Sequence, residues 1–298
     1  MQKIIPNIWC DHNAAEMAAF YTEAFPGATA DVTARYPAEG LPGFQSEFAG
    51  AELAIEVEVD GYRLTLINAG PEFRPNSTVS VMVNFDPLLF GGDADAARRG
   101  LDDLWAKLSD GGRTMMELAE YPFSPRYGWL QDRFGVNWQL IFGEGEPRPF
   151  LMPSLLFAGE AQNRAREAVD FYVDLFGRSG IGTVAEYPEQ TGPAPAGAIM
   201  YSDFQLEGQW FTAADSGEEM GETFTPGVSL EVRCRDQAEI DRLWNALSAV
   251  PEAEQCGWLV DRFGLSWQIV PENMGELMRR PGAYARMLDM HKLVIADF

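Results

Sequence analysis

The sequence is poor in histidine and cysteine, the side chains that most often hold transition metals. Its 298 residues contain two His and three Cys. Cys10, Cys234 and Cys256 form no CxxC pair and leave an odd thiol, which fits a reducing compartment better than a disulfide framework. His12 and His291 stand near opposite ends of the chain, so neither half holds two imidazoles. This scarcity weighs against metal sites built from imidazole or thiolate.

Basic residues and long apolar runs are also scarce. Lys and Arg number 22 against 45 Asp and Glu, which gives a net charge of -23. A field of that sign repels phosphate backbones and anionic lipids, so we expect neither nucleic acid nor membrane as a partner. No run of 18 apolar residues and no secretory signal pattern is present, and we therefore expect a cytoplasmic protein.

The chain does contain an internal repeat. GWLQDRFGVNWQ at 128–139 returns as GWLVDRFGLSWQ at 257–268, with nine of twelve positions identical. AAFYTEAF at 18–25 likewise corresponds to VDFYVDLF at 169–176, and LWAKLS at 104–109 to LWNALS at 243–248. Because the length also suits two ordinary domains, the repeat predicts two similar copies in tandem.

Hydrophobic spacing predicts the elements within each copy. In the first copy a strand at 3–10 and an amphipathic helix at 13–25 precede extended stretches at 30–36, 44–57 and 62–67,. A second strand, helix and closing hairpin follow, and the second copy runs in parallel, so the chain reads as four βαβββ units. The Gly- and Pro-containing stretch 142–153 predicts the boundary. We therefore expect domains at 1–145 and 146–272, and a tail at 273–298 with two short helices separated by Pro281.

The repeated motifs also carry a family resemblance. NAAEMAAFY with GWLQDRFGVNW, EAEQCGWLVDRFGLSWQIVP and the tail ARMLDMHKL resemble the PhnB-like branch of the vicinal oxygen chelate superfamily. That superfamily includes glyoxalase I, bleomycin-resistance proteins and extradiol dioxygenases. The resemblance implies an α+β fold with two tandem glyoxalase-like domains, each a pair of βαβββ modules whose curved, antiparallel-rich sheets surround a cavity.

The branch is often labelled 3-demethylubiquinone methyltransferase-like. A methyl-donor site of the nucleotide-binding kind would need a Gly-rich loop between a strand and a helix. The Gly pairs beginning at Gly91 and Gly111 lack that context. We therefore expect no methyltransferase activity.

The closing hairpin of each copy supplies most of the candidate binding residues. If Gln139 faces the concave side of its strand, alternation places Asn137 on the same side and Trp138 toward the helices. Gln268 and Ser266 form the corresponding pair in the second copy. Trp129 and Trp258 stand on the strands that pair with these two strands, which makes them the best aromatic candidates,.

A metal site is the alternative use of the same positions. The resemblance implies a Glu ligand where this chain has Gln139 and Gln268, and His or Glu ligands on the opening strands, where it has Asn7 and Ser154. Glu231 could add a carboxylate, as could Glu56 or Glu58. Neutral amide and hydroxyl oxygens bind divalent metals weakly unless carboxylate or imidazole ligands complete the site. We expect no tightly bound metal or other cofactor.

Three functions remain open. The first is small-molecule binding in a cupped site, like the bleomycin-resistance proteins of the superfamily. The second is a metal-dependent enzyme of the glyoxalase, lyase, isomerase or dioxygenase type, so enzymatic activity is undecided. The third is a scaffold, in which the tandem copies replace a homodimer. The two Gln side chains could also simply satisfy buried backbone groups.

Overall fold

The computed structural model describes residues 2–143 and 148–298. The predicted domain boundary at 145/146 therefore lies outside the described residues. The first half of the chain contains β1 Ile4–Cys10, α1 Ala14–Ala24, β2 Thr29–Arg35, β3 Glu52–Val59, β4 Tyr62–Asn68, β5 Val79–Phe85, α2 Ala94–Ser109, β6 Arg113–Tyr121, β7 Ser124–Gln131 and β8 Asn137–Phe142.

The second half repeats this order and adds the tail. It contains β9 Leu151–Phe157, α3 Ala165–Leu175, β10 Gly180–Glu186, β11 Ile199–Leu206, β12 Gln209–Asp215, β13 Val228–Cys234, α4 Gln237–Leu247, β14 Trp258–Val260, β15 Ser266–Pro271, α5 Met274–Leu277 and α6 Ala283–Leu288. The two short tail helices were predicted from sequence and are confirmed. None of the helices in the described ranges is long and apolar enough to cross a membrane.

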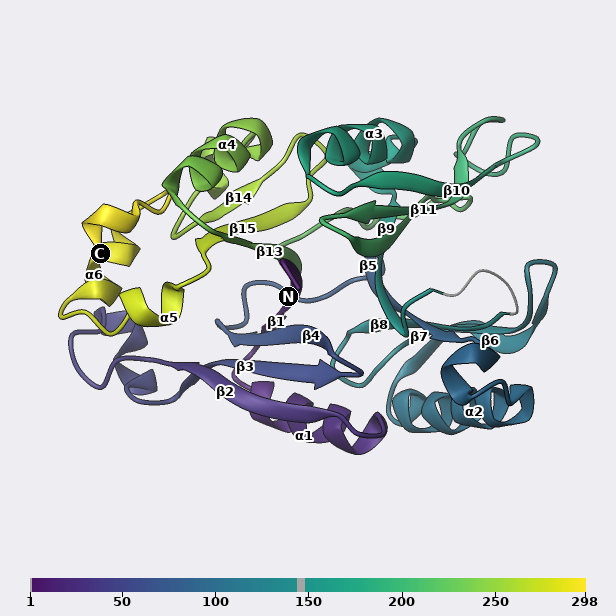
Figure 1. Cartoon of the computed structure of the whole chain (residues 1–298), viewed down its shortest axis with the longest axis horizontal. Coiled ribbons are helices and arrows are strands. Elements are labelled where there is room, and N and C mark those ends of the chain that lie inside the picture. Colours follow the sequence, from purple (N-terminus) through teal and green to yellow (C-terminus); the bar gives the residue numbers. More distant parts are fainter. Residues whose placement is uncertain (1, 144–147) are drawn as a thin grey trace. The chain divides into compact units, whose positions relative to one another are not determined.

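Two mixed sheets organise the chain (Figure 1). One sheet has the strand order β2-β3-β4-β1-β13-β15-β14, and the other has the order β10-β11-β12-β9-β5-β8-β7-β6. Each sheet belongs to one compact unit. Unit 1 comprises Met1–Thr22, Ala28–Arg74 and Thr225–Phe298, and unit 2 comprises Glu23–Gly27 and Pro75–Phe224. The α+β class and the paired-module architecture are as expected.

The compact units do not follow the two sequence copies. Unit 1 joins the first module of copy one to the last module of copy two through antiparallel pairing of β1 with β13. Unit 2 joins the inner two modules through antiparallel pairing of β5 with β9. The division at 145/146 therefore stays a prediction about the sequence copies, whereas each folded unit takes one module from each copy.

Helices α2, α3 and α4 pack on one face of their sheets. On the opposite face of unit 1, the tail with α5 and α6 packs against Val270 at the end of β15,. In unit 2, α2 packs on β7 so closely that a methyl group added at Gly128 would lie 2.4 Å from a ring carbon of Trp105. Gly128 alternates with Tyr127 and Trp129, so those two residues project from the opposite face. Figure 1 shows α2 beside β6, β7 and β8, and α4 beside β14 and β15. We call the opposite side of each sheet its helix-free face.

The repeated DRFG sequence is a structural anchor. The side chain of Asp132 accepts hydrogen bonds from the backbone N–H groups of Phe134 and Val136 at 2.9 and 3.0 Å, and from Trp138 Nε1 at 2.9 Å. Asp261 accepts the equivalent three bonds at 2.8, 3.0 and 2.8 Å. Gly135 and Gly264 have φ of 91° and 89°, in the left-handed region that glycine adopts without strain. The motif recurs because each hairpin needs the same carboxylate.

Two expectations about local structure need correction. Residues 43–48 form a 3₁₀ helix after Pro42, and β3 begins only at Glu52, so the predicted extended stretch 44–57 is wrong over its first part. The fixed φ of Pro42 and the exposed polar side chains of Ser46 and Glu47 favour a turn there,. The last module also has one strand fewer, because residues 251–253 form a 3₁₀ turn where the longer first copy has β6.

The described cysteines are all free. Cys10 and Cys234 are buried, as expected for small core residues, while Cys256 is half-buried. Burial raises the pKa of the Cys10 and Cys234 thiols to about 12, which makes both unreactive near neutral pH. His12 is exposed and stacks on Phe48 with ring centroids 4.1 Å apart, which agrees with a surface loop.

Candidate functional site

Each helix-free face has four neutral polar side chains at its centre. In unit 1, Asn7 stands opposite Ser229 on β13 and Thr65 on β4, and Gln268 completes the group from β15. In unit 2, Ser154 stands opposite Ser80 on β5 and Thr212 on β12, and Gln139 completes the group from β8. We call these groups quartet 1 (Asn7, Thr65, Ser229, Gln268) and quartet 2 (Ser154, Thr212, Ser80, Gln139).

Gln139 links three of the four members of quartet 2 by hydrogen bonds. Gln139 Nε2 donates to Ser80 Oγ at 2.8 Å and to Ser154 Oγ at 3.3 Å. Its Oε1 accepts from the hydroxyl of Tyr127 at 2.7 Å. Burial raises the pKa of Tyr127 far above its usual value, so this phenol remains a donor at neutral pH. The expected orientation of Gln139, away from the helices, agrees with these partners.

Quartet 1 has the same glutamine bond but lacks the tyrosine. Gln268 Nε2 donates to Ser229 Oγ at 2.9 Å. The position that corresponds to Tyr127 is Cys256, because the closing hairpins are offset by 129 residues. No donor among the described residues reaches Gln268 Oε1. The two faces therefore share a plan and differ in how their central amide is satisfied.

Several polar groups on these faces are buried without a hydrogen-bond partner among the described residues. They are the hydroxyls of Thr65, Thr212 and Ser266, the indole N–H of Trp129 and the Oδ1 atom of Asn137. Thr65 and Thr212 occupy equivalent quartet positions. A buried unpaired polar group costs roughly 1–3 kcal/mol, and native folds tolerate few of them. Their concentration on the helix-free faces marks these faces as unusual.

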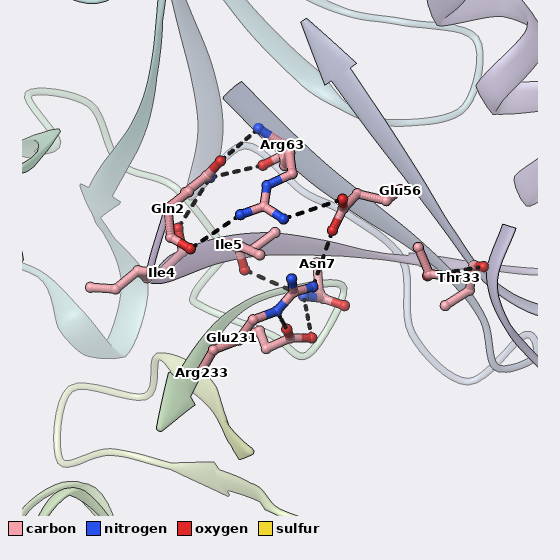
Figure 2. Close-up of polar contacts among 10 residues, drawn as sticks. Gln2, Ile4, Ile5, Asn7, Thr33, Glu56, Arg63, Glu231 and Arg233 are labelled. Atoms are coloured by element: carbon pink, nitrogen blue, oxygen red, sulfur yellow. Dashed lines mark hydrogen bonds and ion pairs between the residues drawn. The ribbon is translucent and has the colours of Figure 1, made fainter. Parts of the chain in front are cut away.

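Charged side chains lie beside quartet 1, next to Asn7 (Figure 2). Glu56 accepts from Arg63 Nη1 at 3.4 Å with one carboxylate oxygen and from Arg233 Nη2 at 3.1 Å with the other. Arg233 Nε also donates to Glu231 at 2.7 Å, and Glu231 accepts from Asn7 Nδ2 at 3.4 Å. Burial disfavours the charged guanidinium of Arg233, but Glu231 and Glu56 outweigh it and raise the pKa of Arg233. We call Glu56, Arg63, Glu231 and Arg233 the charged network.

Aromatic side chains border both quartets. In unit 1, the rings of Trp9 and Trp258 meet edge to face with centroids 5.7 Å apart. In unit 2, Tyr127 contacts the rings of Phe123 and Tyr121 at 5.0 and 5.6 Å. Phe123 belongs to the longer hairpin of the first copy and is 62% exposed. Both faces thus combine neutral hydrogen-bonding groups with partly accessible rings.

The residues present do not fit a divalent metal ion. Across 2–143 and 148–298, no three His, Cys, Asp or Glu side chains gather into a possible metal group. The quartets offer amide and hydroxyl oxygens. The carboxylates beside them, Glu56 and Glu231 in unit 1 and Asp203 in unit 2, each bond to an arginine. A bound cation would have to compete with those guanidinium groups while gaining only weak neutral ligands.

The structure brings together most residues that the sequence singled out. Asn7, Gln268 and Glu231 meet in unit 1, and Gln139 and Ser154 meet in unit 2. The four others project from the same faces beside them: Trp258 and Ser266 in unit 1, Trp129 and Asn137 in unit 2. No measurement of binding tests these positions, so their role stays a prediction. The expected grouping by copy is absent, because Asn7 meets Gln268 and not Gln139.

Sequence reasoning missed several members of the faces. They are Thr65, Ser80, Thr212, Ser229, Arg63 and Arg233. One signal was available, because β5 and β13 both begin with Val-Ser and β1 and β9 both carry Pro one position before the quartet residue. Alignment of these strands would have found Ser80 and Ser229. The arginines had no counterpart in the other copy and could not have been found in that way.

Comparisons with known proteins agree with this architecture. A family model described as 3-demethylubiquinone-9 3-methyltransferase matches residues 2–141 and 150–270. A PhnB protein of Bacillus cereus is 26% identical and covers 48% of this chain and 100% of its own, with a TM-score of 0.38. No curated protein matches significantly.

Two solved structures of low identity share the fold. A point mutant of glyoxalase I from Zea mays is 13% identical, with 93% of this chain and 94% of its own covered and a TM-score of 0.50. A protein of Bacillus subtilis subsp. subtilis strain 168, provisionally assigned as a dioxygenase, is 11% identical, with 91% and 85% covered and a TM-score of 0.50. These likenesses concern the fold alone. The chain belongs to the family described as 3-demethylubiquinone-9 3-methyltransferase, whose PhnB-like members have the vicinal oxygen chelate fold.

Proposed function

We propose that the chain binds small polar organic molecules on the helix-free faces of its two units, without a tightly held metal ion. The observation that carries this proposal is the matched pair of quartets. Each presents amide and hydroxyl groups at the centre of a curled sheet, with rings at the border. Such groups both donate and accept hydrogen bonds, which suits orienting a small ligand.

The unpaired buried groups support binding over a purely structural role. Side chains selected only for stability would be apolar or fully hydrogen-bonded at such central positions. Instead, Thr65 and Thr212 leave equivalent hydroxyls without a partner among the described residues. Rotation about the Cα–Cβ bond can present a hydroxyl to an incoming ligand, and bound ligand would recover part of the roughly 1–3 kcal/mol that each unpaired group costs.

The family description names a methyltransferase, but the described faces favour binding over methyl transfer. The quartets contain no general base with a perturbed pKa, and Tyr127 is held neutral by burial. The strand, Gly-rich loop and helix that a nucleotide-like methyl donor uses are also missing from the sequence,. The alternative, a metal-dependent enzyme, requires carboxylates that here are bonded to arginines.

A thermal-stability screen tests the proposal. Wild-type protein and the variants Gln139→Ala and Gln268→Ala are heated with a panel of neutral and zwitterionic metabolites. A ligand at 100 times its Kd should stabilise the protein by about 2.7 kcal/mol, and each variant should lose the response of its own unit. Asp170→Ala, on the exposed surface of α3, is the control. Responses that are undiminished in both glutamine variants, or that require added divalent ions, would contradict the proposal.

A further inference from the structure

The two helix-free faces differ in charge at equivalent positions. The opening modules are offset by 147 residues and β5 and β13 by 149. Arg63 therefore corresponds to Trp210 in unit 2, Glu231 to Met82, and Arg233 to Asn84. Only Glu56 has an acidic counterpart, Asp203. Unit 1 thus carries two guanidinium groups and two carboxylates where unit 2 carries one carboxylate at the matching positions.

Asp203, the acidic counterpart of Glu56 in unit 2, is buried and hydrogen-bonded. Asp203 accepts from the backbone N–H of Thr183 at 2.7 Å and from Arg148 Nε at 3.1 Å, and its side chain is 4% exposed. Arg148 in turn lies over the ring of Trp210 at 4.0 Å. In the charged network the four side chains are 14% to 27% exposed. The four charges of unit 1 remain partly accessible, whereas in unit 2 the carboxylate is buried and its partner Arg148 is 15% exposed.

The charged network is not needed to build this fold. Unit 2 forms the same strand order around its quartet with Met82, Asn84 and Trp210 in place of the charges. Half-buried ion pairs also carry a desolvation cost that often cancels their attraction. A purely structural role therefore does not explain why unit 1 keeps four charges where unit 2 forms the equivalent sheet with one.

We propose that the helix-free face of unit 1 selects a small zwitterion, a molecule with a carboxylate and an ammonium group on a short carbon skeleton. This inference rests on the proposed binding function and specifies the ligand class of one face. Arg63 Nε and Arg233 Nη1 donate to no acceptor among the described residues. These N–H groups are available to a ligand carboxylate, for which the guanidinium fork is suited.

The oxygen acceptors of this face suit the ammonium group of such a ligand. Glu231 and Glu56 hold lone pairs beyond those used by the arginines, and Gln268 Oε1 receives no bond from the described residues. The four charges of the network sum to zero. A ligand that carries a net charge would therefore add an uncompensated charge to this partly buried site. A zwitterion offers a carboxylate to the arginines and an ammonium group to the glutamates. Its net charge of zero leaves the net charge of the site unchanged.

The test exchanges residues between the faces. Glu231→Met with Arg233→Asn installs the unit 2 residues and leaves the net charge of the chain unaltered. Four probes share one skeleton: 4-aminobutanoate, butanoate, butylamine and butanamide. Ligand-observed NMR measures the binding of each probe to the wild type, the double variant and a control. The control, Arg166→Asn with Glu186→Met, removes an exposed ion pair of unit 2.

We expect the wild type and the control to bind 4-aminobutanoate more tightly than the three other probes. The double variant should lose this preference by about tenfold or more, which corresponds to about 1.4 kcal/mol. Should the double variant fold poorly, Arg63→Gln is the milder substitution and should weaken the same preference. Circular dichroism and the retained binding of butanamide confirm that each variant is folded.

Three results would overturn the inference: absent binding of 4-aminobutanoate, equal binding of butanoate or butylamine, or a preference that survives the double variant. These results are distinguishable from failure of the proposed function. If butanamide still binds and Gln139→Ala abolishes that binding, neutral ligand binding stands and only the zwitterion selection falls. A stoichiometric divalent ion in each unit would instead remove the proposed function itself.

Discussion

Tyr127 on β7 donates its hydroxyl hydrogen to Gln139 Oε1 on β8 at 2.7 Å. This bond fixes which end of the amide points at Ser80 and Ser154, because the oxygen is already engaged and the Nε2 group must donate to the serines. The central amide of unit 2 is therefore oriented before any ligand arrives. In unit 1 no donor among the described residues fixes Gln268 in this way.

Removal of this donor should loosen the amide. Tyr127→Phe leaves Gln139 Oε1 without its partner, and we expect the free energy of unfolding to fall by about 1 kcal/mol, as for a typical buried hydrogen bond. Urea denaturation at neutral pH measures the change. Tyr121→Phe, which loses an exposed bond to the backbone of Glu117, should cost less. Equal losses in the two variants would mean that the bond to Gln139 contributes nothing specific.

Buried tyrosines should make the protein sensitive to alkali. Burial raises the pKa of Tyr62, Tyr127 and Tyr201, so the folded state keeps these protons after the unfolded chain has released them near pH 10. The unfolded state then binds fewer protons, and the free energy of unfolding falls as pH rises above about 10. Urea denaturation between about pH 8 and about pH 11 should show this fall, with a shallower slope for Tyr127→Phe. A pH-independent stability over that range would contradict the burial of these phenols.

Substitution of an unpaired buried threonine by valine should stabilise the protein. Thr212→Val replaces a buried hydroxyl that has no partner among the described residues with a methyl group of similar size. We expect the free energy of unfolding to rise by about 1 kcal/mol while ligand binding in unit 2 weakens. Thr78→Val is the matched control, because Thr78 Oγ1 donates to Asn76 at 2.7 Å and its loss should destabilise. A loss of stability in Thr212→Val as large as in the control would show that the Thr212 hydroxyl is paired.

The hairpin carboxylates should be essential for stability. Asp132→Ala removes the acceptor of three hydrogen bonds, from Phe134, Val136 and Trp138, and we expect a loss of about 3 kcal/mol or more. Thermal denaturation by circular dichroism measures it. Asp170→Ala, at an exposed position of α3, should change stability little. A melting temperature close to that of the wild type in Asp132→Ala would contradict the assignment of this residue as an anchor.

Much of the fold could be predicted from local patterns. Alternation of apolar residues located the strands, and Asp, Phe and Gly at the hairpins marked turns whose glycines do take positive φ,. The same alternation grouped Gln139 with Asn137, and Gln268 with Ser266, on one side of each closing strand. Residues 43–48 escaped this reasoning because their spacing fits an extended strand as well as a 3₁₀ turn,.

Such local patterns could not predict which modules pair with each other in the fold. Strand pairing between β1 and β13 joins residues more than 200 positions apart, and nothing local distinguishes this partner from β5, which also begins with Val-Ser. The contact of Arg233 with Glu56 was missed for the same reason, because these residues become neighbours only after strands from different copies pair,.

The central claim is that neutral quartets bind small molecules without a resident metal, and metal content tests it most directly. Protein purified without chelator is assayed for divalent transition metals by inductively coupled plasma mass spectrometry, and the same sample is weighed by native mass spectrometry. We predict metal far below one ion per chain, together with retained organic ligand or ready uptake of one from the screen. One tightly bound ion in each unit, lost in Gln139→Ala and Gln268→Ala, would contradict the account.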